Sequence, residues 1–358
     1  MTSNGSASPA DDLLARLPGS PDAYPQQIDL IRGAVLLILL DATAYRSASF
    51  LDDRILGPAT QGVWVPVDRV VQAAQLARNL RPLHFIFHTG HVGSTLLSRL
   101  LDEKGDVLSV REPLPLRTLA DASDALPRAD SLLSPGQFER ILQTFLRLWS
   151  RAYETTRTVV VKATSSVGRL AAPILSASER SRAIYLNVRA EPYLATLLAG
   201  ENSPLDLRGH GPERMRRLQQ RVTVPLPPLH QLSIGELAAL SWLAESCTQR
   251  ETLKRFGERV IALDFDAFLS SVTDGMQRVA IHFGMGDDAR FLSMVGRSPA
   301  LTRYSKAPEH AYTPEVRAEV LRDSRRDNRG EIRKGMAWLE GQARANSALA
   351  ELVTGGAL

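Results

Sequence analysis

The chain has 358 residues, of which 44% are hydrophobic and 23% are charged. These proportions are typical of a globular protein, and the length suffices for one large α/β domain with additions or for two domains. The net charge of +4 would attract an anionic ligand, but no lysine-rich tract points to nucleic acid, so we expect no nucleic-acid partner. The single cysteine, Cys247, excludes an intramolecular disulfide and a cysteine-based zinc site and fits a reducing compartment.

The first part of the sequence shows no sign of membrane targeting. Residues 1–11 lack the basic and apolar regions of a secretory signal. The longest early apolar run, Ala34–Leu40, is much shorter than the roughly 20 residues that a membrane-spanning helix needs. We therefore expect a cytoplasmic protein without a membrane partner.

Residues 1–82 are predicted to form an N-terminal extension that is partly helical. Ala10–Leu17 favours a short helix, whereas Ile28–Leu40 is compatible with either a strand or a helix. Pro66–Leu80 is predicted to be a helix, because proline suits the first helical turn and apolar residues recur along one face of the segment.

The stretch 83–101 has the pattern of a phosphate-binding unit. Leu83–Phe87 is typical of a buried parallel strand, a turn with Gly90 and Gly93 follows, and Ser94 and Thr95 open a leucine-rich helical segment. Glycine lets backbone N–H groups converge on an anion, and the helix N-terminus adds a partial positive charge. The alternative is an ordinary strand–turn–helix in which the two hydroxyl residues only cap the helix.

The turn lacks the lysine of a Walker A motif, since Ser94 follows Gly93 directly. This favours a phosphate-bearing ligand other than ATP or GTP. At His91–Thr95 the chain resembles the sulfotransferases, whose Lys/Arg-Ser-Gly-Thr-Thr turn cradles the 5′-phosphosulfate of 3′-phosphoadenosine 5′-phosphosulfate (PAPS), with histidine here in the basic position. No carboxylate clearly partners a Walker-type hydroxyl, so we expect no metal. The resemblance implies that PAPS is the co-substrate and that these residues bind it: Gly90, His91, Val92, Gly93, Ser94 and Thr95.

A second predicted strand, Asp106–Val110, is followed by Arg111 and Glu112. Pro113 biases Glu112 towards an extended conformation, and a side chain at the carboxyl end of a parallel strand lies at the edge where α/β folds bind ligands. In several sulfotransferase branches a glutamate in a comparable position takes the proton of the acceptor. The resemblance therefore implies that Glu112 is the general base, and an ion pair with Arg111 or Arg117 is the alternative.

A third strand, Thr158–Val161, leads into Lys162. This lysine matches the lysine of the Lys-Thr-His phrase that contacts the leaving group in cytosolic sulfotransferases. Thr164 stands where that family has its histidine base, which is why the base is assigned to Glu112, with His88 next in line. The resemblance further implies that Lys162, together with the histidine of the glycine turn, neutralises the charge on the departing oxygen. The alternative is a surface lysine at a strand end.

A fourth strand, Ala183–Val188, ends at Arg189. The segment Arg189–Thr196 resembles the family phrase Arg-x-Pro-x-Asp-x-x-x-Ser, in which the arginine and the serine hold the 3′-phosphate of the nucleotide. In this chain the proline is one place later, and Thr196 replaces the serine in a shifted register. The resemblance implies that Arg189 and Thr196 bind the cofactor. The alternative is a helix start with Thr196 in the core.

The stretch Glu201–Gln231 is rich in proline, glycine and arginine and is predicted to be irregular. It could close over an anionic nucleotide as a lid, or present a solvated basic surface. Ser233–Phe256 is then predicted to be a long helix, because Ser233 followed by Glu236 has the spacing of a capping box. A last strand is predicted at Arg259–Leu263.

The C-terminal part carries a further group of anion-binding side chains. Arg303, Ser305 and Lys306 lie in a loop-like phrase that could line the acceptor site or the nucleotide site. One long charged helix is predicted from Pro314 to about Arg344. Within it, the phrase Arg333-Lys334-Gly335 echoes a 3′-phosphate loop of the family, but its helical pattern favours a solvated basic face.

These elements predict an α/β fold, a three-layer sandwich with a central mainly parallel sheet like that of P-loop NTPases and with helical additions at both ends. The expected boundaries are 1–82 for the extension, 83–290 for the sulfotransferase-like domain and 291–358 for a C-terminal loop and helix. The resemblance covers roughly 83–290 and implies transfer of a sulfuryl group from PAPS to a hydroxyl or amine of a small-molecule or conjugate acceptor. Neither the identity of the acceptor nor the oligomeric state can be predicted.

Two other functions fit part of the pattern. A small-molecule kinase using ATP would need a metal-binding carboxylate at a strand end, for which Asp264 or Asp266 is available, but the Walker lysine is missing. A non-catalytic nucleotide-binding protein would keep the glycine turn and tolerate the loss of Glu112.

Overall fold

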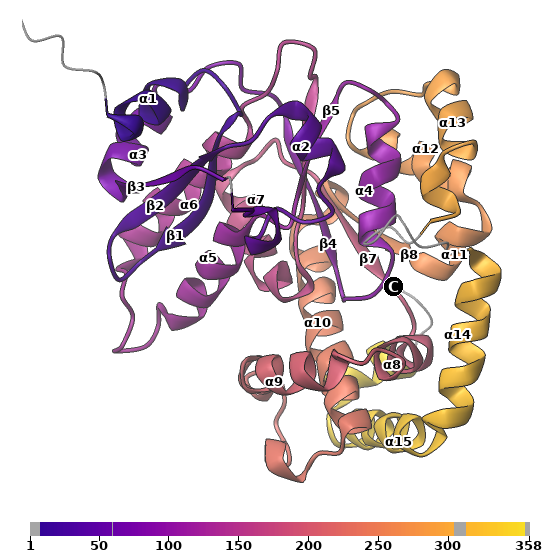
Figure 1. Ribbon diagram of the computed structural model, residues 1–358. Coiled ribbons are helices and arrows are strands. Elements are labelled where there is room, and N and C mark those ends of the chain that lie inside the picture. Colours follow the sequence, from indigo (N-terminus) through magenta and orange to yellow (C-terminus); the bar gives the residue numbers. More distant parts are fainter. Residues whose placement is uncertain (1–7, 59, 304–312, 355–358) are drawn as a thin grey trace, which may run out of the picture. The chain divides into compact units, whose positions relative to one another are not determined.

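The computed structural model describes residues 8–58, 60–303 and 313–354 (Figure 1). Over these ranges, no helix has both the length and the apolar character needed to cross a membrane. The chain divides into two compact units, each assembled from separate stretches of sequence. The first unit comprises Met1–Ile86, Leu97–Arg182 and Phe283–Met285, and the second comprises Phe87–Leu96, Ala183–His282 and Gly286–Leu358.

Five strands form a sheet in the order β5-β6-β4-β7-β8. β4 and β5 each pair in parallel with β6, and β7 pairs in parallel with β8. Parallel neighbours need crossover connections, which helices supply here. The predicted α/β fold, with helices around a central parallel sheet, is therefore confirmed. The strands are β4 (Leu83–His88), β5 (Val107–Arg111), β6 (Thr158–Lys162), β7 (Ala183–Asn187) and β8 (Val260–Asp264).

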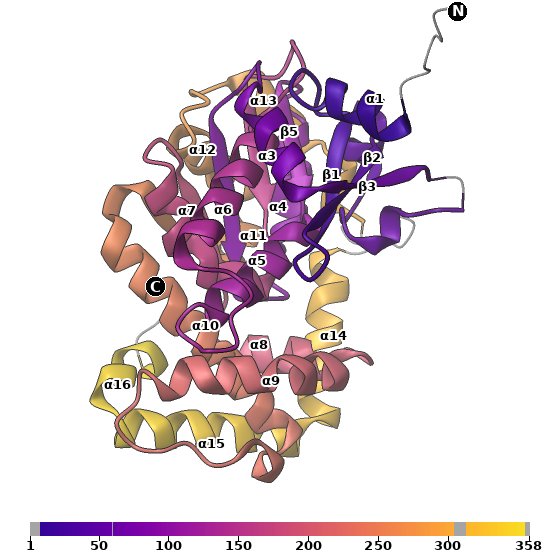
Figure 2. The ribbon, with the colours of Figure 1, turned by 90° about the vertical axis from the view of Figure 1, so that its left-hand side faces the viewer.

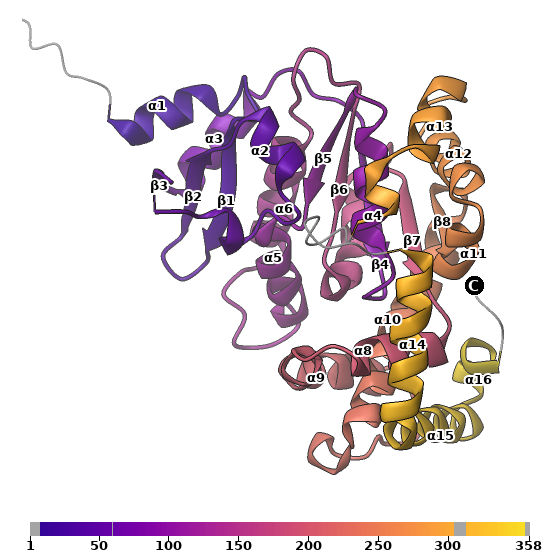
Figure 3. The same ribbon diagram turned by 45° about the vertical axis from the view of Figure 1, so that its right-hand side comes forward.

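The first unit adds a small antiparallel sheet, in the order β1-β2-β3, to its share of the parallel strands. Helices α1 and α3 contact this sheet, as Figure 3 shows. In addition to its parallel strands and the C-terminal part of α4 (Ser94–Asp102), the unit contains α1 (Pro9–Arg16), β1 (Ala23–Asp29), β2 (Ala34–Leu39), α2 (Ala42–Ser47), β3 (Gly62–Pro66), α3 (Val67–Gln75), α5 (Leu114–Ala125), α6 (Pro135–Trp149) and α7 (Ala171–Ala177), with short 3₁₀ helices at Asp53–Ile55 and Ser165–Leu170.

The apolar run near the N-terminus belongs to a β-hairpin. The ambiguous segment Ile28–Leu40 is divided between β1 and β2. A carboxylate oxygen of Asp29 accepts hydrogen bonds from the backbone N–H groups of Ile31 and Arg32 at 2.9 Å, and Gly33 has a φ of 61°. A side-chain acceptor followed by a left-handed glycine closes a tight turn, which a helix would not allow.

The second unit is built around α10, which is buried along most of its length. Helices α8, α9 and α15 all contact it (Figure 2). In addition to the end of β4 and the start of α4, the unit contains β7, α8 (Ala190–Leu198), α9 (Ser203–Gln219), α10 (Ile234–Phe256), β8, α11 (Phe265–Ser270), α12 (Val272–His282), α13 (Ala289–Gly296), α14 (Pro314–Asp327), α15 (Arg329–Ala345) and α16 (Ser347–Thr354), with short 3₁₀ helices at Leu229–Gln231, Gly257–Arg259 and Pro299–Leu301.

Two predictions about this unit are wrong. The segment predicted to be irregular contains α9, a helix of 17 residues with Pro212 in its interior. The long charged helix of the tail is two helices, α14 and α15, which meet at Asn328. The predicted helical state of Arg333-Lys334-Gly335 is confirmed, because these residues lie within α15.

The residue Gly335, in the segment Arg333-Lys334-Gly335, lies where α15 packs against α10 and α8. A Cβ atom added at Gly335 would lie 2.5 Å from both the backbone oxygen of Gly235 in α10 and a methyl carbon of Leu194 in α8. Glu331 of α15 accepts a hydrogen bond from the backbone N–H of Gly235 at 2.9 Å. The two glycines therefore allow α15 to approach α10 closely.

Candidate functional site

The predicted phosphate-binding turn lies in the second unit, between the end of β4 and the start of α4. Three of its residues have left-handed backbone conformations, with φ angles of 105° at Gly90, 53° at His91 and 68° at Gly93. Left-handed residues in a tight turn direct successive N–H groups to one side, which creates a concave anion-binding surface. The turn then runs directly into the N-terminus of α4, where the helix dipole favours negative charge.

Two features require glycine at position 93: its left-handed backbone angle and the close approach of the Phe265 ring. A Cβ atom added there would lie less than 3.0 Å from three atoms of the Phe265 ring, at the start of α11. Phe265 itself is buried, with 6% of its surface exposed. The apolar ring therefore fixes the position of the turn, so that the N–H groups do not depend on a ligand for their arrangement.

The hydroxyl residues that open α4 are almost fully buried. Ser94 is 4% exposed and Thr95 is 2% exposed. The Thr95 hydroxyl has no hydrogen-bond partner within the described part of the chain. An unpaired buried hydroxyl costs roughly 1–3 kcal/mol. His88 shapes the same turn, because its Nδ1 accepts a hydrogen bond from the Gly90 N–H at 3.1 Å.

The turn opens into a cavity of about 380 Å³ within the second unit. Among the residues that the sequence predicted, His91 to Thr95 line it together with Thr196 of α8, so the structure brings these residues to one site. The Thr196 hydroxyl donates to the Pro192 carbonyl at 2.7 Å. Much of the remaining wall is apolar, from Phe265, Leu269 and Val272. The cavity thus combines the glycine turn and the N-terminus of α4 at one end with a largely apolar wall.

Arg317 of α14 is a site residue that the sequence did not reveal. It lines the cavity, pairs with Asp266 at 2.7 Å and lies over the face of the Phe265 ring, 5.1 Å from its centroid. Because α14 contains several arginines, no sequence pattern distinguishes Arg317 from its neighbours. Its guanidinium, held by Asp266 and the Phe265 ring, places a positive charge at the wall of the cavity beside the glycine turn.

Arg189 lies at a second cavity, of about 450 Å³, in the same unit. This cavity shares Leu269, Pro314 and Arg317 with the first one. The two cavities are therefore neighbours, and Arg317 can face a ligand that occupies both. Arg303 also lines the first cavity, whereas Ser305 and Lys306 lie outside the described residues.

Glu112 and Lys162 come together in the first unit. The Lys162 Nζ forms an ion pair and hydrogen bond with a Glu112 carboxylate oxygen, and the two side chains are only 1% and 10% exposed. A lysine at this depth is not a surface residue, so that alternative is excluded. The sequence suggested Arg111 or Arg117 as the ion-pair partner of Glu112, but the partner is Lys162, and Arg111 instead pairs with Asp102.

The backbone of Glu112 differs from the predicted extended conformation. Its φ angle is 51°, a left-handed value that costs a non-glycine residue roughly 1–2 kcal/mol. The Glu112 N–H donates to the Lys162 carbonyl at 2.6 Å, so the same residue holds both the backbone and the side chain of Glu112. Strained residues of this kind are concentrated at functional sites.

Phe50 and Arg54, which belong to a sequence phrase (Tyr45–Arg54) whose charged residues could reach the active site or form a structural ion-pair network, lie beside this pair. The Arg54 guanidinium lies over the Phe50 ring, 3.5 Å from the ring centroid, and the Lys162 Nζ lies 5.6 Å from the same centroid. Arg54 is in turn held by Asp52 through two hydrogen bonds, at 2.8 and 2.5 Å. The aromatic face therefore supports two cations next to the Glu112 carboxylate.

Arg111 holds the segment that presents Phe50. Its fully buried guanidinium donates to the carbonyls of Tyr45 and Ala48 at 3.0 Å, and the Arg111 carbonyl accepts from the Leu51 N–H at 2.7 Å. Burial raises the pKa of its partner Asp102, although the Arg111 charge opposes the shift. Among the described residues, no group of three or more His, Cys, Asp or Glu side chains could hold a metal ion.

No family model and no curated protein matches this sequence. Among solved structures, the chain is similar to a sulfotransferase domain from the curacin biosynthetic pathway, at 15% identity and a TM-score of 0.39 over 74% of this chain and 99% of that one. It is also similar to a sulfotransferase from Alicyclobacillus acidocaldarius (15% identity, TM-score 0.38, 75% and 99%) and to a mouse sulfotransferase complexed with PAP (12% identity, TM-score 0.37, 82% and 96%). The similarity is one of fold, and the chemistry of the cavity has to be judged from this chain's own residues.

Proposed function

We propose that this protein binds PAPS at the cavity of the glycine turn and transfers its sulfuryl group to a hydroxyl or amine of a small-molecule or conjugate acceptor. The observation that carries the proposal is the left-handed turn at Gly90–Gly93, which opens onto the α4 N-terminus and the unpaired hydroxyl of Thr95. Backbone N–H groups and a buried hydroxyl are donors suited to a phosphate oxygen.

The neighbouring cavity supports a ligand with two anionic ends. Arg189 and Arg317 line it, and Arg317 lines the first cavity as well. A nucleotide with a 5′-phosphosulfate and a 3′-phosphate has two such ends, whereas the phosphates of ATP form one linear chain. The absence of a lysine between Gly93 and Ser94 also disfavours ATP, because that lysine normally reaches the β- and γ-phosphates.

Sulfuryl transfer resembles phosphoryl transfer, in which positioning and charge stabilisation do most of the work. The acceptor oxygen or nitrogen bonds to sulfur while the bond from sulfur to the bridging oxygen breaks, and the bisphosphate leaves with the electron pair. In our proposal Glu112 takes the acceptor proton, and Lys162 and His91 neutralise the charge on the departing oxygen. One donor of this kind lowers the barrier by roughly 3–4 kcal/mol.

The first test is ligand binding measured by thermal unfolding. Adenosine 3′,5′-bisphosphate in metal-free buffer should raise the unfolding midpoint, since a ligand at 100 times its Kd stabilises by about 2.7 kcal/mol. ATP with Mg²⁺ should raise it little. The opposite order of the two ligands would favour a kinase and would contradict the proposal.

Thr95→Val tests the site itself. Valine keeps the shape of the buried side chain and removes only the unpaired hydroxyl, so we expect the fold to be unaffected and the bisphosphate affinity to fall by about 10- to 150-fold, or roughly 1.5–3 kcal/mol. Thr89→Val is the matched control, because Thr89 also has a buried hydroxyl without a partner among the described residues but does not line the cavity. Equal affinities for both variants and the wild type would place the phosphate elsewhere.

A further inference from the structure

Arg117, in the first unit, is a cation that the proposed reaction leaves without a role. It lies in α5, which begins shortly after Glu112, and it is half-buried. Its side chain forms no hydrogen bond or ion pair with any residue that the structure describes. A guanidinium close to the assigned base is thus left without an anion.

The other cations of this cluster are each matched by one carboxylate. Lys162 pairs with Glu112. Arg54 donates to Asp52 from Nε and Nη2, at 2.8 and 2.5 Å. Burial opposes the ionisation of Asp52, but the hydrogen bonds from Arg54 and the charges of Arg54 and Arg117 hold its pKa below the usual value. Arg117 therefore lies within electrostatic range of a carboxylate that already has its partner, so the cluster consists of two ion pairs and one unmatched arginine.

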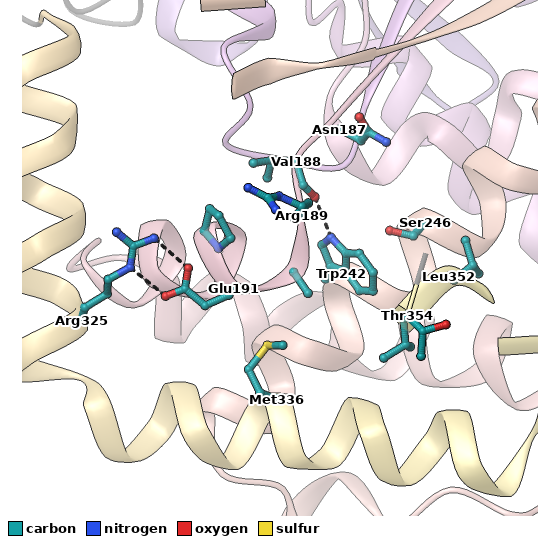
Figure 4. A pocket seen from close by; sticks show the side chains of 13 residues that line it. Asn187, Val188, Arg189, Glu191, Trp242, Ser246, Arg325, Met336, Leu352 and Thr354 are labelled. Atoms are coloured by element: carbon teal, nitrogen blue, oxygen red, sulfur yellow. Dashed lines mark hydrogen bonds and ion pairs between the residues drawn. The ribbon is translucent and has the colours of Figure 1, made fainter. Parts of the chain in front are cut away.

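Charged side chains that are taken out of water are normally paired within the chain. Arg325 of the second unit is an example, since Glu191 accepts two hydrogen bonds from it at 2.8 and 2.7 Å (Figure 4). A half-buried guanidinium without such a partner has lost part of its hydration and gained nothing in return, which is unfavourable. Arg117 is therefore suited to an anionic group that another molecule brings.

Arg54 supplies a second donor to this group. Asp52 occupies its Nε and Nη2, and its Nη1 has no partner among the described residues. The guanidinium is held over the Phe50 ring, while 57% of the side chain is exposed. Its bonds to Asp52, with a smaller contribution from the charge of Glu112, raise the pKa of Arg54 against the effect of burial. Arg54 is thus a fixed, accessible donor near the base, and an arginine already held in place loses little freedom on binding.

We propose that Arg117, assisted by Arg54, binds a carboxylate of the acceptor, so that the acceptor is a carboxylic acid bearing the reacting hydroxyl or amine. The inference rests on the proposed function, because it names the class of molecule whose proton Glu112 takes. One unmatched arginine suits a carboxylate, which carries a single negative charge and fits the planar donors of a guanidinium. A neutral or cationic acceptor would leave Arg117 unmatched.

The binding test uses three phenols that differ in the charge of the side group: 4-hydroxyphenylacetate, its neutral amide and the cation tyramine. In isothermal titration of the wild type without nucleotide, the acid should bind with a Kd of about 1 mM or below and the other two at least about tenfold more weakly. Arg117→Gln should weaken binding of the acid about tenfold and leave the amide unchanged, and Arg117→Lys should recover part of the loss because it keeps the charge. No binding of the acid, equal binding of acid and amide, or an acid affinity unaffected by Arg117→Gln would overturn the proposal.

Arg78→Gln is the matched control, because Arg78 is exposed and precedes the amino end of β4, whereas Glu112 follows the carboxyl end of β5. It should bind every probe as the wild type does. If Arg117→Gln fails to fold, the probe series on the wild type decides the matter.

Sulfate transfer from labelled PAPS to the same probes separates this inference from the proposed function. The acid should have a kcat/KM at least about tenfold above that of the amide. Binding of the acid that depends on Arg117, without transfer to any probe, would support the carboxylate site and contradict the proposed reaction. Equal transfer to the acid and the amide would support the reaction and refute the carboxylate site.

Discussion

Replacing Gly93 with alanine should be unusually costly, for two reasons that can be separated. The φ angle of 68° is left-handed, and this conformation costs a residue with a Cβ atom roughly 1–2 kcal/mol. The new Cβ would also lie within 3.0 Å of three Phe265 ring atoms, and forcing extra volume into a packed region typically costs roughly 1–3 kcal/mol. We therefore expect Gly93→Ala to lower the free energy of unfolding by roughly 2–5 kcal/mol in total.

Urea unfolding of five proteins separates the two terms: the wild type, Gly93→Ala, Phe265→Leu, the double variant and Gly105→Ala. Phe265→Leu removes Cε2 and Cζ, the two ring atoms nearest to the added Cβ, so in that background Gly93→Ala should cost little more than the conformational part, roughly 1–2 kcal/mol. Gly105→Ala is the control, because Gly105 has a φ of 80° with open space around the added Cβ. If Gly93→Ala costs no more than Gly105→Ala, or if Phe265→Leu gives no relief, the close packing that we hold responsible for shaping the turn is refuted.

Two further predictions concern catalysis and pH. Glu112→Gln should abolish transfer of labelled sulfate from PAPS while sparing bisphosphate binding, and Lys162→Ala should lower the transfer rate more than the bisphosphate affinity. The control Glu154→Gln, at an exposed position, should change neither the transfer rate nor the bisphosphate affinity. Full activity of Glu112→Gln would show that another residue is the base. Burial raises the pKa of the Cys247 thiol from 9.0 to about 12, so the folded state holds this proton more tightly than the unfolded chain does, and the resulting stability is lost as the pH rises above 9. Relative to Cys247→Ala, the wild type should lose about 2 kcal/mol of unfolding free energy between pH 8 and about pH 10.5, and identical pH profiles would contradict this.

Local signals in the sequence predicted the elements whose ends are set by neighbouring residues. The capping box of Ser233 and Glu236 begins α10 as expected, with both reciprocal hydrogen bonds present. The strand–turn–helix of the glycine turn was predicted for the same reason, because Gly90 and Gly93 permit backbone angles that other residues rarely adopt.

Features that depend on contacts distant in sequence could not be predicted. α9 forms despite its glycines and Pro212, with Arg217 held by Glu213 of the same helix and by Glu245 of α10. The left-handed backbone of Glu112 is imposed by its bonds to Lys162, which lies fifty residues later in the chain. A propensity that operates over a few residues contains no information about such partners.

A crystal structure of the protein with adenosine 3′,5′-bisphosphate tests the central claim most directly. The account predicts that oxygens of the 5′-phosphate accept hydrogen bonds from backbone N–H groups between His91 and Thr95 and from the Thr95 hydroxyl, at donor–acceptor distances of roughly 2.7–3.2 Å. A bisphosphate bound elsewhere, with the N–H groups of this turn facing only solvent, would contradict it.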